Sequence, residues 1–126
     1  MGNSVDIALW TVQGLLAVVY LAAGGLKIVR SREQLVATGR LDWMKDNSDA
    51  AVKAVGAVEI LGALGLILPQ ATGIAPVLTP IAAVGLVVVQ IGAFRVHLTR
   101  HERQPLPVNA MLLLLAAFVA IGRFAG

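Results

Sequence analysis

The chain has 126 residues, of which 58% are hydrophobic and only 13% charged, with a formal net charge of +3 and a mean hydropathy of +0.84. This composition excludes an ordinary soluble enzyme, because soluble domains carry about 25% charged residues, and it excludes a disordered chain, because disorder requires low hydrophobicity. The absence of cysteine excludes disulfides, thiolate metal sites and thiol nucleophiles, so that any redox chemistry requires a bound cofactor or a partner. We expect the chain to lie in a lipid bilayer.

Four long apolar segments follow one another along the chain, over about residues 5–29, 50–68, 74–96 and 106–122. A helix needs about 20 mostly apolar residues to cross the hydrocarbon core of a bilayer, and each segment is near that length. Their apolarity is continuous and does not alternate, which predicts helices rather than barrel strands. The sequence therefore predicts one integral membrane domain over residues 1–126, an all-α four-helix transmembrane bundle.

The three connections between these segments differ in character. Residues 30–49 interleave charged with apolar side chains, including Trp43, and predict either an amphipathic or re-entrant segment at the membrane interface or a solvated loop. Residues 69–73, from Pro69 to Gly73, predict a tight turn between antiparallel helices. In the third connection, about residues 95–107, Pro105 and Pro107 end the polar extension of the third helix.

The basic residues predict the orientation in the membrane. Nine of the ten lie in or beside the first and third connections, and only Arg123 lies on the opposite side. Cytoplasmic connections carry an excess of Lys and Arg, so we expect both connections in the cytoplasm, with both termini and the 69–73 turn outside it. This basic stripe matches anionic lipid headgroups, and we predict no nucleic-acid partner.

Small residues recur seven positions apart in three of the segments. A spacing of seven places both members on one helix face, where small side chains allow helices to approach closely in membranes. The alternative is that Gly and Ala are simply common in membrane helices. The pairs are Ala17 and Gly24, Gly56 and Ala63, and Gly85 and Gly92.

Glu59 is the most informative polar residue within the segments. It lies ten residues before Pro69, about 15 Å from that end of the helix and close to the middle of the membrane. A carboxyl group there costs about 2.5 kcal/mol or more unless it is paired, protonated or hydrated, so we expect it to face the bundle interior. Lys27 and His97 are its two candidate partners; alternatively, Lys27 snorkels to the interface and His97 is solvated.

Three neutral polar residues, Gln13, Gln90 and Asn109, lie in three different segments. They predict hydrogen bonds between helices, and a ligand-facing role is the alternative. Arg123, at the end of the last segment, is expected to anchor to lipid headgroups, with an ion pair to Asp6 as the alternative. The aromatic residues, among them Tyr20, are too scattered to predict a pocket.

His97 and His101 are four residues apart with Glu102 adjacent, which is the spacing of two metal ligands on one helix face. Arg100 and Arg103 flank them and disfavour a cation, so we predict no metal site. The sequence contains no phosphate-binding loop, dinucleotide fingerprint or Ser-His-Asp set, so we predict no catalytic residue and no enzyme activity of the chain on its own.

In the run GAVEILGALGLILP at residues 56–69, a glutamate precedes a glycine-rich helix end and a proline. This run resembles the second helix of the DoxX-like family of small bacterial membrane proteins. AAGGLK at 22–27 and GAFRVHL at 92–98 resemble the ends of its first and third helices, and Asn109 and Arg123 also match. The resemblance covers nearly the whole length.

The resemblance implies a multi-pass protein of the bacterial plasma membrane. The family is named after a membrane subunit of a thiosulfate:quinone oxidoreductase, and its relatives are associated with redox and stress-related membrane complexes, although most have no assigned activity. It therefore suggests a quinone as the ligand and a membrane or peripheral redox subunit as the partner. Without cysteine, this chain cannot itself carry thiol or persulfide chemistry.

Three hypotheses of function follow. In the first, the bundle interior binds a lipophilic small molecule such as a quinone, or supports a redox subunit, through the ligand-binding or proton-exchanging residues Glu59, Lys27, His97, Gln90, Gln13 and Asn109. In the second, Glu59 is the proton or cation site of a small transporter, which requires a homo-oligomer because four helices are few. In the third, the polar residues only specify packing.

Overall fold

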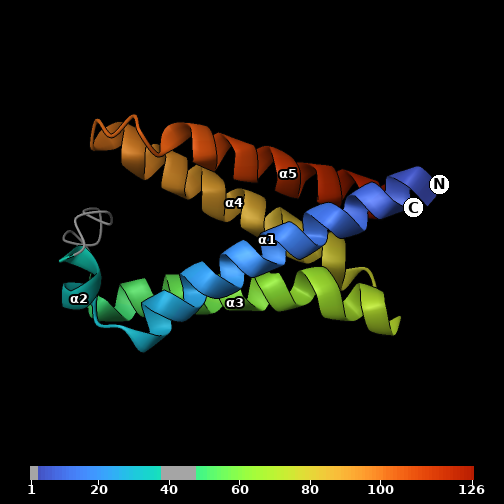
Figure 1. Cartoon of the computed structure of the whole chain (residues 1–126), viewed down its shortest axis with the longest axis horizontal. Coiled ribbons are helices and arrows are strands. Elements are labelled where there is room, and N and C mark those ends of the chain that lie inside the picture. Colours follow the sequence, from blue (N-terminus) through green and yellow to red (C-terminus); the bar gives the residue numbers. More distant parts are fainter. Residues whose placement is uncertain (1–2, 38–47) are drawn as a thin grey trace.

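The computed structural model describes residues 3–37 and 48–126, and all the regular secondary structure within these ranges is helical (Figure 1). Four of its helices are long and apolar enough to cross a membrane, and the fifth is a short helix in the first connection. The predicted all-α four-helix architecture is confirmed. The helices are α1 (Asn3–Val29), α2 (Arg32–Val36), α3 (Asp49–Thr72), α4 (Leu78–Thr99) and α5 (Leu106–Ala125).

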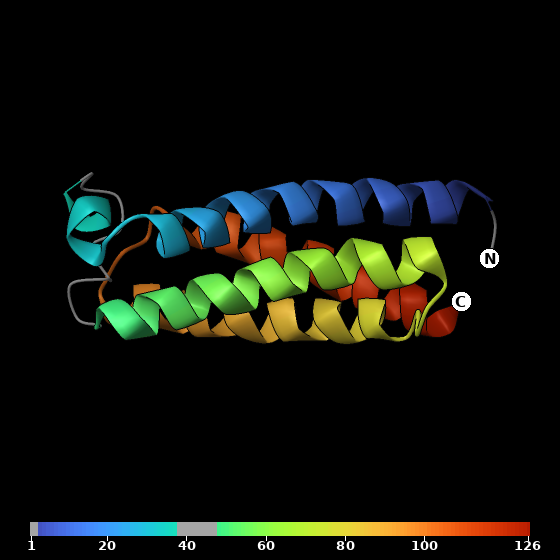
Figure 2. The ribbon, with the colours of Figure 1, turned by 90° about the horizontal axis from the view of Figure 1, so that it is seen from below.

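The four long helices form two antiparallel pairs, α1 with α3 and α4 with α5, which contact each other through α3 against α4 and α1 against α5. The pairs cross near the end of the bundle that holds both chain termini (Figure 1). They diverge towards the opposite end, where α2 and the α4–α5 connection lie, and Figure 2 shows the four helices running side by side along the long axis. This divergence leaves room for a pocket at that end.

Each long helix buries one stripe of side chains at a spacing of three to four residues and exposes its other faces. The buried stripes contain most of the polar residues of the segments, whereas large apolar side chains such as Val18, Leu61 and Leu114 are about two-thirds exposed. This arrangement suits a lipid environment, in which polar groups must find their hydrogen-bond partners inside the bundle. The buried core is formed mainly by Leu16, Ala17, Tyr20, Ala63, Leu66, Ala83, Leu86, Ala116, Val119 and Ala120.

Helices α1 and α3 come closest where Gly24 faces Gly56. A Cβ atom at Gly24 would lie 2.6 Å from the backbone oxygen of Gly56, and a Cβ at Gly56 would lie 2.8 Å from that of Gly24. The close approach of helices that the small residues predicted is thus confirmed at Gly24 and Gly56, which belong to two different predicted pairs. It is wrong for Gly85 and Gly92, where an added Cβ would meet no described atom within 4 Å.

The predicted turn at residues 69–73 begins too early. Helix α3 continues through Pro69 to Thr72 and ends at Gly73, whose φ of 73° is left-handed. Proline has no N–H to donate to the carbonyl four residues earlier, that of Gly65. The hydroxyl of Thr79 in α4 donates to this carbonyl at 2.8 Å instead, so a side chain from the next helix replaces the missing backbone hydrogen bond.

The start of α4 also differs from the prediction, whereas α5 begins at Leu106 as predicted. Helix α4 begins at Leu78 rather than near residue 74, because Ala75 has a left-handed φ of 47° that interrupts the helix. Pro107 lies in the first turn of α5, where a backbone N–H would have no acceptor within the helix, so the lack of one in proline costs no hydrogen bond. In the first connection, Ser31 caps α2, while the remainder, including Trp43, lies outside the described residues and its place at the interface stays a prediction.

Candidate functional site

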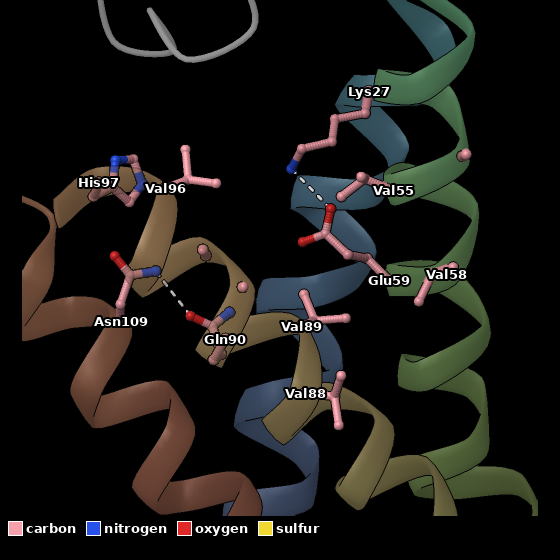
Figure 3. A pocket seen from close by; sticks show the side chains of 13 residues that line it. Lys27, Val55, Val58, Glu59, Val88, Val89, Gln90, Val96, His97 and Asn109 are labelled. Atoms are coloured by element: carbon pink, nitrogen blue, oxygen red, sulfur yellow. Dashed lines mark hydrogen bonds and ion pairs between the residues drawn. The ribbon is translucent and has the colours of Figure 1, made fainter. Parts of the chain in front are cut away.

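A pocket of about 550 Å³ lies between α3 and α4 at the diverging end of the bundle (Figure 3). Five of the six predicted site residues line it together, and Gln13 does not. Five valines form most of its apolar walls, and its polar groups come from all four long helices. The lining residues are Lys27, Ala54, Val55, Val58, Glu59, Val88, Val89, Gln90, Gly92, Ala93, Val96, His97 and Asn109.

Lys27 and Glu59 form a buried ion pair in this pocket, with Lys27 Nζ 2.8 Å from Glu59 Oε1. Their side chains are only 10% and 7% exposed, so Lys27 does not snorkel to the interface. The stem of Lys27 passes over Gly56, where a Cβ would lie 2.8 Å from the Lys27 Cβ. The close approach of the two helices therefore makes room for the pair. The second oxygen of Glu59 points into the pocket (Figure 3).

His97 lines the pocket but is not the partner of Glu59. Its Nδ1 lies 2.9 Å from Glu102 Oε1, and its side chain is 14% exposed, so the expectation of a solvated histidine is also wrong. A carboxylate only accepts hydrogen bonds, so it holds the proton of His97 on Nδ1. His97 and His101 do not share a helix face as predicted, because α4 ends at Thr99 and His101 has a left-handed φ of 57°.

A chain of hydrogen bonds joins three helices behind the pocket. Asn109 in α5 donates from Nδ2 to Gln90 Oε1 in α4 at 2.8 Å, and Gln90 donates from Nε2 to the hydroxyl of Tyr20 in α1 at 2.6 Å. These bonds confirm the predicted interhelical role of Gln90 and Asn109. The other amide atom of Asn109, Oδ1, is buried without a hydrogen-bond partner among the described residues, and it points away from Gln90 (Figure 3).

Tyr20 is a residue of this site that the sequence analysis missed. Tyr20 is 1% exposed. Its hydroxyl accepts a hydrogen bond from Gln90, which is the last bond in the chain of hydrogen bonds that begins at Asn109. The spacing along α1 could have identified Tyr20. It lies seven residues after Gln13 and seven before Lys27, so all three residues share one face of the helix. A tyrosine in register with two polar residues of a membrane helix indicates a hydroxyl directed into the bundle.

Gln13 belongs to a separate polar cluster at the end of the bundle that holds the termini. It donates to the backbone oxygen of Leu66 and accepts from Arg123 Nε at 2.7 Å. Arg123 Nη1 lies 2.8 Å from Asp6 Oδ1, and its guanidinium lies 5.3 Å from the centre of the Trp10 ring. Only 7% of the Arg123 side chain is exposed, so the expected anchoring to headgroups is wrong and the ion pair to Asp6 forms instead.

The comparison with protein families matches residues 11–119, which include the whole pocket, to the DoxX-like family. This chain belongs to the DoxX-like family. No curated protein and no solved structure matches it. Family membership and the four long apolar helices together identify this DoxX-like chain as a multi-pass integral membrane protein in contact with the lipid bilayer.

In this DoxX-like protein the pocket combines an apolar mouth with a polar interior. Val58 of α3 and Val88 of α4 line it and are 49% and 62% exposed, so it opens between the two helices towards the surrounding lipid (Figure 3). The interior presents an ion pair and an unsatisfied amide oxygen. Such a site suits an amphiphilic molecule whose apolar part remains against the valines while its polar head reaches Lys27 and Asn109.

Proposed function

We propose that this DoxX-like protein binds a lipophilic small molecule with an oxygen-bearing head, such as a quinone, in the pocket between α3 and α4. The observation that carries the proposal is the buried Lys27–Glu59 pair inside a pocket whose valine-lined mouth opens towards lipid. Charged residues within a membrane are costly, and they mark functional sites.

The size and chemistry of the pocket support this ligand class. Its volume of about 550 Å³ is within the range of about 300–1,000 Å³ typical of small-molecule sites. An ammonium group has three hydrogens, and an ion pair with one carboxylate leaves Lys27 able to donate to an oxygen of a ligand. A bound quinone would supply electron-transfer chemistry, while the residues of the chain position its head and exclude water.

We further propose a setting for this function. The chain lies in the bacterial plasma membrane, its pocket end faces the cytoplasm and both termini face outward. Support comes from the basic residues Arg95, Arg100 and Arg103 of the third connection and from the position of both termini at the other end (Figure 1). The partner we propose, on the family resemblance alone, is a membrane or peripheral redox subunit.

Native mass spectrometry of the protein, extracted gently from its own membrane, tests the proposal. We expect the wild type to carry a lipophilic ligand and the Glu59→Gln variant to lose it, because the substitution removes the charge that orients Lys27. The matched control is Glu33→Gln, which makes the same change at an exposed residue outside the pocket and retains the ligand.

Two results would contradict this binding role. Equal retention of the ligand by wild type and Glu59→Gln would place the ligand elsewhere. A wild-type protein that carries no small molecule but retains a second polypeptide would favour an accessory-subunit role over ligand binding.

A further inference from the structure

The unsatisfied amide oxygen of Asn109 indicates what kind of head the pocket accepts. Asn109 is 9% exposed and lines the pocket, and its Oδ1 is buried without a partner among the described residues. The large majority of buried polar side-chain atoms in proteins have a hydrogen-bond partner, because an unmade bond in a region of low polarity is costly. Oδ1 is therefore free to accept a hydrogen bond from a bound molecule.

In the hydrogen-bond chain behind the pocket, the free atom of Asn109 is an acceptor. Asn109 uses its Nδ2 to donate to Gln90, and Gln90 uses its own amide nitrogen to donate to Tyr20. With its nitrogen donating to Gln90, Asn109 leaves its oxygen as the amide atom that has no partner among the described residues. The reverse direction of the chain would instead leave an amide N–H there and favour a carbonyl head.

The ion pair adds groups of both kinds. Lys27 offers hydrogens as a donor, and the carboxylate of Glu59 accepts them. A hydroxyl head can both accept a hydrogen bond, as from Lys27, and donate one, as to Glu59 or Asn109. A carbonyl or an ether oxygen can only accept, and it would leave the Asn109 oxygen unsatisfied.

We propose that the pocket recognises a hydroxyl group on a lipophilic body, so that it binds a phenol or a quinol more tightly than the corresponding ether or quinone. This inference rests on the proposed function, which it narrows from an oxygen-bearing head to a hydrogen-bond-donating one. The apolar body lies along Val58 and Val88 at the mouth of the pocket.

Three probes that share a decyl chain test the inference: para-decylphenol, its methyl ether para-decylanisole, and decylbenzoquinone. Their binding to the wild-type protein in phosphatidylcholine nanodiscs is measured by calorimetry, with protein-free nanodiscs subtracting partition into lipid. We expect the phenol to bind about tenfold more tightly than the ether and the quinone, the ratio that one satisfied hydrogen bond provides.

Variants then locate the preference. Asn109→Leu removes the acceptor, and we expect it to bind phenol and ether equally. Asn109→Asp retains an oxygen in the same place, and we expect it to retain the preference for the phenol. Thr79→Val is the matched control, because it removes a buried polar group of α4 outside the pocket, and it also retains the preference.

Each remaining outcome overturns a defined part of the argument. If the wild type binds phenol, ether and quinone equally, the preference for a hydroxyl group is wrong. The proposed function, binding of a lipophilic small molecule in this pocket, would still stand. If the quinone binds more tightly than the phenol, the preference for a hydroxyl group is also wrong. That result would mean that the hydrogen bonds run in the opposite direction and that Asn109 offers an N–H group to the ligand. Binding of none of the probes would overturn both the inference and the proposed function. The wild-type comparison decides these cases even if a variant fails to fold.

Discussion

At the scale of single residues, Lys27 shows how a charge is held inside a membrane bundle. Its ammonium lies 2.8 Å from Glu59, and its side chain is only 10% exposed. A buried charge left without its partner is strongly destabilising, whereas replacing both members of a buried pair by neutral groups costs far less. The pair therefore has to be tested as a unit.

We expect Lys27→Met to lower the free energy of unfolding by about 3 kcal/mol, because it leaves the Glu59 carboxylate unpaired in a medium of low polarity. The double variant Lys27→Met with Glu59→Gln is expected to be more stable than Lys27→Met alone. Equilibrium unfolding by SDS in mixed micelles measures both differences.

A lysine in the facing helix provides the control. Lys53 donates to the exposed backbone oxygen of Ile28, and Lys53→Met should change stability by less than about 1 kcal/mol. If the losses of the two single pocket variants simply add up in the double variant, Lys27 and Glu59 do not stabilise each other.

At the scale of helices, the crossing of α1 and α3 determines whether the ion pair can form. Gly24 and Gly56 bring the two backbones together, and the absence of a side chain at Gly56 makes room for the stem of Lys27. A stripe of small residues thus has a packing function at this crossing. At Gly92 the missing side chain instead leaves space in the pocket.

We expect Gly56→Ala to destabilise the protein by about 2 kcal/mol, because its Cβ would lie 2.8 Å from both the Gly24 oxygen and the Lys27 Cβ and would force the helices apart. The measurement is again the unfolding free energy in mixed micelles. Gly25→Ala is the matched control in α1, since a Cβ there meets no described atom within 4 Å.

The control has its own expected sign. Alanine loses less conformational freedom than glycine when it joins a helix, so Gly25→Ala should stabilise the protein by up to about 1 kcal/mol. Equal losses at Gly25 and Gly56 would mean that the helix crossing does not depend on the close approach of the backbones.

Pro69 shows what a helix boundary depends on. Proline commonly ends a helix, and this predicts a turn at the position where α3 in fact continues. The helix continues because Thr79, on the neighbouring helix, donates to the carbonyl of Gly65 that proline leaves free. The partner that decides this boundary lies in another element, so local sequence rules do not reveal it.

At the scale of the whole molecule, the distribution of charge predicts an orientation that single cysteines can test. The chain contains no cysteine, so each introduced thiol is the only one. The two variants are Gln104→Cys and Ile74→Cys. Gln104 is exposed in the α4–α5 connection, and Ile74 is 74% exposed at the other end of the bundle. In intact spheroplasts, a membrane-impermeant maleimide should label the cysteine at position 74 and spare that at 104 until the membrane is broken.

The opposite labelling pattern would place the pocket end outside the cytoplasm and contradict the orientation predicted from the basic residues. Equal labelling of both positions in intact spheroplasts would mean that the chain inserts in both orientations. Lysed spheroplasts are the control, since both cysteines should then react.

Much of the architecture follows from the sequence by itself. A bilayer gives the backbone no water to bond with, so four apolar segments of spanning length must be helices, and a mid-segment carboxyl such as Glu59 must face inward. Both predictions depend on properties of a segment and its solvent. They require no knowledge of which helices are neighbours.

The tertiary structure decided which partner each polar group takes. It paired Glu59 with Lys27 and not with His97, paired Arg123 with Asp6 and separated Gln13 from the pocket. These choices depend on where two helices cross and how each is rotated, as at Gly24 and Gly56, and rotation and crossing result from the packing of all four helices together. The pocket follows from the same packing, because it exists only where the two helix pairs diverge.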